Sequence, residues 1–501
     1  MQLNHHKKAL GLYKMPSTLY RILALILTLT QMAPAYADSS IWYSKDDPFK
    51  TQALTPPVIP QGYLSDKSTS PCAQLNVNTT LTLADVADAA LCNNPQTREA
   101  WANARIQAAQ VGITRSAYLP SVTDNISGNF TWSDPEQATR KNPYNTISNS
   151  IVASYLLYDF GNRNATLENA RQLLQAASAT QDATIQTILL SVIQSYYLAQ
   201  SGVAALEASR EAERASEESF KAANARYIAG IVTPADKLQA QTAYAQATLL
   251  RITAEGTVKT AYGTLANVMG IDSNQPLTLA PSLSADGGQN IEADINGLIE
   301  QARNRRPDLM ASEAQVKAAQ AAIEASKAAA KPTVSLGVSN NVQDGSNITS
   351  NNNSTVGFTV AIPLFNGYAP TYRIRSAEAT ADARVAQRDR IRLQISLDVW
   401  RAYQSLRTAN ETITASNILL SSAEESERVA LGRYKAGVGN IIDTLNAQSA
   451  LANARQQKIT AQLNWNIARA TLAQSIGSLD NAMIQSLPEG NIIKTGLDAQ
   501  P

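Results

Sequence analysis

Two aspartates follow glycine turns at equivalent places in the chain, and they are its clearest candidates for chemistry. Asp236 lies six residues after Gly230, and Asp443 lies six residues after Gly437, with a Thr or an Asn three residues before each acid. A glycine at the left-handed end of one helix, then a capping residue and an acid in the next first turn, predicts a helix-turn-helix connection at each place. There each carboxylate stabilises a helix N-terminus by about 0.3–1 kcal/mol, which leaves a second role open.

The histidine content excludes most catalytic and metal-binding chemistry. The two histidines, His5 and His6, precede an apolar run over 22–32 that ends in an Ala-Tyr-Ala sequence. This pattern, behind four Lys or Arg residues, predicts a cleavable signal peptide over residues 1–37, so the mature chain would hold no histidine. Ser-His-Asp, Cys-His and histidine-metal sites are then impossible. With no phosphate loop, paired-carboxylate site or metal-ligand spacing recognisable, we expect neither an enzyme nor a bound cofactor or metal.

The signal peptide predicts that the chain is exported, and three further expectations concern its charge, its cysteines and its membrane segments. Lys and Arg number 42 against 41 Asp and Glu, a balance that excludes the broad basic surface of a nucleic-acid binder. In an oxidising compartment Cys72 and Cys92 would most simply form a disulfide, with two unpaired thiols as the alternative. The mature sequence predicts no transmembrane helix, so membrane residence would have to use strands.

The elements that must position the two aspartates occur twice. Pro95 to Pro120 and Pro307 to Pro332 are each 25 residues apart, and the spacing from Gly161 to Gly230 is 69 against 70 from Gly367 to Gly437. Such self-similarity predicts one duplicated unit. The expected organisation is a signal peptide, an N-terminal periplasmic extension, two repeats and a tail, with bounds 1–37, 38–80, 81–280, 281–480 and 481–501.

Each repeat is expected to hold one very long helix, shorter helices and one hairpin of strands. Segments 163–227 and 372–434 contain no proline, and each would form a helix of about 95 Å. Helices about half as long are predicted near 83–117, 235–267, 295–330 and 441–474. The regions near 121–158 and 333–364 alternate apolar with small or polar residues, which is the period of a strand with one apolar face.

Four strands of this kind cannot close a membrane sheet alone, because the smallest known membrane barrels have eight. Two chains would supply eight strands, whose interior side chains would fill. Three chains would supply twelve. Small residues on the opposite face, such as Thr333, Ser335 and Gly337, favour a wet lumen and therefore the trimer. A soluble sheet capping a helical rod, or a plain helical bundle, is the alternative.

These features resemble the TolC family of trimeric outer-membrane efflux and secretion channels. The resemblance covers about 81–479 and rests on the Arg-Tyr-x-x-Gly turns and on the motifs at 94–95, 117–120, 158–161 and 363–367. It implies a mainly α fold with a membrane β-barrel: a long coiled-coil-like α-helical barrel, plus four strands per chain that complete a 12-stranded trimeric barrel. It also implies outer-membrane lipid, a large periplasmic part, a periplasmic adaptor protein and an inner-membrane transporter as partners.

The resemblance also assigns roles at the turns. Gly230 and Gly437 would mark the periplasmic tips that dock the adaptor. Asp443 matches a pore-constricting acid, so a trimer would present three carboxylates that disfavour anions and bind cations.

Tyr434 and Asp236 match residues that tether neighbouring helices in a closed channel. Where the family can carry a second acid this chain has Asn446, and where it can carry a gate-tethering Arg it has Gly439. Both departures argue against a strongly locked gate.

Within the family, Cys72 together with 90–98 looks most like the outer-membrane components of type I secretion. The expected function is therefore the exit duct of a tripartite system that exports a large unfolded protein with an ABC transporter. Small-molecule or drug efflux with a proton-driven pump is the alternative. A non-conducting envelope scaffold, which would share the helices, is the rival from another class.

Overall fold

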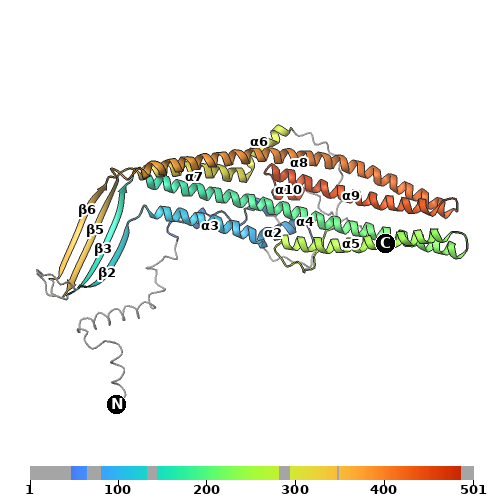
Figure 1. The fold of residues 1–501 in the computed structure, drawn as a ribbon, viewed down its shortest axis with the longest axis horizontal. Coiled ribbons are helices and arrows are strands. Elements are labelled where there is room, and N and C mark those ends of the chain that lie inside the picture. The colour runs from blue at the N-terminus through green and yellow to red at the C-terminus, as the bar shows by residue number, and fades with distance from the viewer. Residues whose placement is uncertain (1–46, 65–79, 132–143, 281–293, 347–348, 487–501) are drawn as a thin grey trace, which may run out of the picture. The chain divides into compact units, whose positions relative to one another are not determined.

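The computed structural model describes residues 47–64, 80–131, 144–280, 294–346 and 349–486. The chain divides into two compact units, 1–52 and 53–501, and the second holds the sheet and all of the long helices (Figure 1). The predicted signal peptide lies outside the described residues, as does the tail after the short helix α10 (Asn481–Ser486). Two short 3-10 helices, Gln52–Leu54 and Gln61–Tyr63, precede the first repeat.

The two repeats have matching elements in the same order. The first contains α2 (Leu83–Asn93), α3 (Pro95–Ser116), a strand hairpin, α4 (Asn162–Ile228) and α5 (Pro234–Val268). The second contains α6 (Ile295–Arg305), α7 (Pro307–Ala329), a strand hairpin, α8 (Ala369–Lys435) and α9 (Ile441–Ser475). Both long helices have 67 residues, or about 100 Å, and both returning helices have 35. The elements thus match as a duplicated unit requires.

The single helices expected near 83–117 and 295–330 are each divided in two. The breaks fall at Asn94 and Arg306, whose ψ angles of 126° and 122° are extended. Each precedes a proline, which has no N–H to donate and excludes its predecessor from the helical region. The sequence contained this signal, because both prolines were among the residues that revealed the repeat.

The helices lie in neighbouring columns. One half of α4 packs against α3 and α7, and its other half packs against α5 and α9. The second long helix, α8, packs against α7 and then α9. One edge of the unit is therefore formed by α3 and α5, and the other edge by α8 (Figure 1).

The strands form one antiparallel sheet in the order β2-β3-β5-β6. Their bounds are Ser121–Thr131, Tyr144–Tyr158, Thr333–Gly345 and Asn351–Ala361. The register pairs Val122 with Ala153, Ala153 with Val338, and Val338 with Val356, so the apolar residues of all four strands share a face. That face is open, with Val122 67% and Phe358 72% exposed. The opposite face carries small and polar residues, as the alternation predicted.

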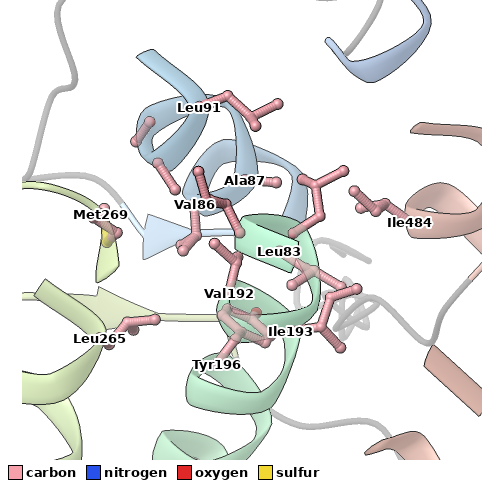
Figure 2. Packing of buried hydrophobic residues seen from close by; sticks show 14 of the residues in the cluster. Leu83, Val86, Ala87, Leu91, Val192, Ile193, Tyr196, Leu265, Met269 and Ile484 are labelled. Carbon is pink, nitrogen blue, oxygen red and sulfur yellow. The ribbon is translucent and has the colours of Figure 1, made fainter. Parts of the chain in front are cut away.

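The largest hydrophobic core lies where α2 crosses the middle of α4 (Figure 2). Leu83, Leu91, Val192 and Ile193 are almost fully buried there, with Leu265 from α5. By length and composition alone, α4 has a stretch that is long and apolar enough to cross a membrane. Half of that stretch is buried inside the structure, because it supplies the core.

The described part of the N-terminal extension is fastened to this region. Trp101 Nε1 donates to the Pro56 carbonyl at 3.1 Å, and Gln181 Nε2 donates to the carbonyls of Pro57 and Val58 at 2.8 and 3.0 Å. Ile59 is buried in the core itself. Residues 53–64 therefore form a strap that joins α3 to α4.

Candidate functional site at the helical turns

Both turns are Schellman motifs built on glycine. Gly230 has φ +74° and donates to the Tyr227 carbonyl at 3.0 Å, while Ile231 donates to the Arg226 carbonyl at 2.9 Å. The same pair of hydrogen bonds closes the second turn, where Gly437 has φ +79°. Glycine suits these positions because a Cβ is disfavoured at positive φ. The sequence predicted this geometry; the adaptor-docking role of the turns stays a prediction.

The two aspartates have different local partners. Asp236 belongs to a capping box, in which its Oδ2 accepts from Thr233 N at 3.0 Å and from Thr233 Oγ1 at 2.8 Å. In the second turn the Asn440 side chain caps α9 by accepting from Ile442 N at 3.0 Å. The Asp443 carboxylate is exposed, and it makes no hydrogen bond or ion pair within the described residues. Asp443 is therefore the acid that is available to a solute.

Asp443 and Asn446 line one groove between α8 and α9. Val429, Ala430 and Arg433 contribute from the α8 side. The structure thus brings together the two residues that the resemblance placed at the aperture. Their role in constricting a pore stays a prediction.

Arg226 is a site residue that the sequence reasoning missed. Its guanidinium lies 4.1 Å from the Tyr434 ring centroid and donates to the Tyr434 carbonyl at 2.9 Å. The contact joins the last turn of α4 to the last turn of α8, and the Tyr434 ring is only 5% exposed. In the other repeat Tyr227 is exposed, with Lys237 over its ring at 5.1 Å. Both repeats carry Arg-Tyr, but only packing between repeats decides which arginine meets which tyrosine.

The structure does not join Asp236 to Tyr434. Asp236 is engaged in its capping box, and the buried Tyr434 hydroxyl has no hydrogen-bond partner within the described chain. Close packing also explains why residue 439 is a glycine and not an arginine, because a Cβ at Gly439 would lie 2.8 Å from the Tyr434 backbone nitrogen. The role of Tyr434 and Asp236 in tethering neighbouring helices of a closed channel stays a prediction.

The expected disulfide falls partly outside the described residues. Cys92, on α2, is not a free cysteine in the structure. Cys72 lies in the segment that the structure does not describe. The pairing of these two residues therefore stays a prediction.

Comparison with known proteins places the whole repeat architecture in a family. A family model described as "Outer membrane efflux protein" matches residues 86–271 and 298–478. Protein CyaE of Bordetella pertussis is 31% identical over 419 residues, which cover 81% of this chain and 86% of that protein. The probable efflux pump outer membrane protein TtgC of Pseudomonas putida is 25% identical over 408 residues, or 79% of this chain and 82% of that protein.

The fold agrees with solved structures. The outer membrane protein VceC of Vibrio cholerae superimposes with a TM-score of 0.69 at 18% identity, over 79% of this chain and 96% of that one. The expected mainly α architecture with a strand domain is thereby confirmed. Because the family model spans both repeats, the chain belongs to the outer membrane efflux protein family, the TolC-like channels of the outer membrane, and is not an enzyme.

Proposed function

We propose that three copies of this chain close into a duct through the outer membrane. The observation that carries the proposal is the pair of unlike open edges. β2 and the α3–α5 column form one edge, and β6 and α8 form the other. Both edges expose leucine, with Leu249 of α5 65% exposed and Leu393 of α8 72% exposed. Unlike edges that bind each other make a head-to-tail contact, which closes into a ring when the rotation from copy to copy completes a full turn.

The number of chains follows from the strands. Four strands per chain give eight in a dimer, whose interior would be filled by side chains, and twelve in a trimer. The polar face of the described strands carries no Asp, Glu, Lys or Arg. It consists mainly of Ser, Thr, Asn and Gly; for example, Ser335 pairs with Thr359 across two strands, and Gly337 pairs with Gly357. Such a face suits a water-filled lumen that admits cargo of either charge.

Type I protein secretion is the export system that we propose. Support comes from the likeness of Cys72 and 90–98 to type I secretion components, together with the 31% identity to Protein CyaE. In this reading the turns at Gly230 and Gly437 meet a periplasmic adaptor protein, and an inner-membrane ABC transporter supplies the energy. Asp443 and Asn446 line the entrance, where a ring of carboxylates would bind cations.

Small-molecule efflux with a proton-driven pump is the second candidate. The specific observation in its favour is the 25% identity to TtgC, which is named as an efflux pump component. Both candidates need the same duct, so the identity of the exported cargo, a protein or a small molecule, decides between them.

The experiment compares proteins in the culture medium of the parent strain, a strain lacking this chain and a complemented strain. We expect selective loss of one large protein from the medium and its return on complementation. Unchanged medium proteins, together with accumulation of drugs inside the cells, would transfer the proposal to small-molecule efflux. Absence of both phenotypes, with no conductance in planar bilayers and no heat-resistant trimer in detergent, would leave a non-conducting scaffold.

A further inference from the structure

Both junctions between strand and long helix hold an aromatic residue in the left-handed conformation. Phe160 (φ 52°) precedes Gly161 (φ 91°) before α4, and Gly367 (φ 59°) precedes Tyr368 (φ 62°) before α8. A bulky residue at positive φ is strained, so it persists only where the surroundings or a function maintain it. The same strain in both repeats points to a role for the two rings.

Each strained ring meets a second aromatic ring at its junction. Tyr158 and Phe160 have centroids 4.7 Å apart, and Phe365 and Tyr368 have centroids 5.4 Å apart, both in edge-to-face geometry. All four rings are exposed. With the exposed Leu364 they continue the apolar sheet face toward the helices. Aromatic rings at that level are typical of the membrane–water interface.

One exposed cation lies over a ring of the first junction, and a second lies over Tyr372, which follows Tyr368 by one turn of α8. Lys331 Nζ lies 5.8 Å from the Phe160 ring centroid, and the Arg375 guanidinium lies 5.6 Å from the Tyr372 ring centroid. Neither cation forms an ion pair within the part of the chain that the structure describes. The acid of the first junction, Asp159, is buried and paired with Arg163 at 3.1 Å. Lys331 thus leaves positive charge beside Phe160, and Arg375 leaves positive charge on the first turns of α8 after Tyr368.

We propose that these residues form a lipid-binding collar for anionic glycerophospholipids of the periplasmic leaflet. The collar is defined as the four junction rings with the two cations: Tyr158, Phe160, Lys331, Phe365, Tyr368 and Arg375. Its rings lie at the end of the apolar sheet face that is nearest the helices, which would place them at the depth of the lipid glycerol groups. The long side chains of Lys331 and Arg375 extend from there to the headgroup phosphates. The collar rests on the outer-membrane location of the family and not on the identity of the cargo.

The test measures lipid bound to the purified full-length protein in detergent, with phosphatidylglycerol and phosphatidylcholine as probes. The variant is Lys331→Gln with Arg375→Gln. The control is Lys317→Gln on α7 with Arg390→Gln on α8, which also removes one lysine and one arginine charge, about 21–22 Å farther from the sheet. We expect the variant to bind phosphatidylglycerol about tenfold more weakly and phosphatidylcholine unchanged, while the control binds both as the wild type does.

Equal binding by variant and wild type would overturn the collar, as would an equal loss in the control. Displacement of phosphatidylglycerol by millimolar inorganic phosphate would also overturn it, because the site would then be a general anion site. The secretion phenotype is a separate readout. A strain that secretes normally with the Lys331→Gln, Arg375→Gln chain leaves the proposed duct intact whatever the lipid result.

Discussion

At the scale of single residues, Arg226 holds the two tips together. Arg226→Ala removes both the cation over the Tyr434 ring and the donor to the Tyr434 carbonyl. The two contacts contribute about 1–2 kcal/mol, so we expect α8 to move more freely at its tip and single-channel conductance to rise. Lys237→Ala is the matched control, because Lys237 lies over the Tyr227 ring at the other tip and that contact does not join the two repeats. Equal conductance changes in the two variants would contradict a specific clamp.

The two aspartates allow a similar pairwise comparison. Asp443→Asn should weaken block of the channel by divalent cations, because a trimer would lose three exposed carboxylates while Asn440 continues to cap α9. Asp236→Asn removes the same charge at the equivalent position, where the carboxylate is already engaged by Thr233. We expect little change in cation block there. Planar-bilayer recordings with and without a divalent cation measure both, and equal effects would refute the assignment of Asp443 to the aperture.

At the scale of the elements, two glycine turns of the same geometry differ in how closely the rest of the structure packs against them. Gly270 and Gly230 share the same Schellman geometry, with φ of 73° and 74°. A Cβ on Gly270 would lie 2.6 Å from the Asn93 carbonyl carbon, whereas Gly230 faces open space. Gly230→Ala should therefore cost only the left-handed strain, about 1–2 kcal/mol, and Gly270→Ala should cost at least about 2 kcal/mol more. Thermal melts of the purified protein compare them, and equal melting temperatures would contradict the close packing.

The strap over 53–64 encloses a carboxylate on α4. Burial raises the pKa of Asp182, and burial is also the main cause of the raised pKa of Tyr63, to which Asp182 and Asp480 add. An acid whose folded pKa exceeds its unfolded value binds more protons when folded, so stability falls as pH rises through that window. Asp182→Asn should therefore stabilise the protein at pH 7, with the gain lost below the ordinary value of 3.8. Thermal melts at both pH values, with the exposed Asp382→Asn as control, check the sign.

The sequence predicted those parts of the fold that depend on local signals. The spacing of Gly161, Gly230, Gly367 and Gly437 revealed the repeat, because glycine adopts the left-handed conformation of such turns without steric cost. The clamp at Arg226 could not be predicted, since it joins residues 208 apart and depends on how the two repeats pack, with α4 against α9 and α9 against α8. The strap was equally hidden, because the backbone carbonyls that hold it leave no side-chain pattern.

At the scale of the whole molecule, the unlike edges decide how copies assemble. Leu249→Asp spoils the α5 edge and Leu393→Asp spoils the α8 edge, so each should remove the trimer from detergent solution, as measured by size-exclusion chromatography with light scattering. Burial of a leucine contributes about 1.5–3 kcal/mol per contact, and a charge there adds a desolvation cost. Leu198→Asp on α4, which lies between other columns, is the control and should keep the trimer.

Coexpression of the two edge variants tests the head-to-tail contact directly. The intact α8 edge of the Leu249→Asp chain can bind the intact α5 edge of the Leu393→Asp chain, which makes one sound contact. The pair then presents only spoiled edges, so growth must stop at two chains. A mixture that returned to trimers would contradict head-to-tail closure. A mixture that stayed monomeric would contradict the assignment of α5 and α8 to one interface.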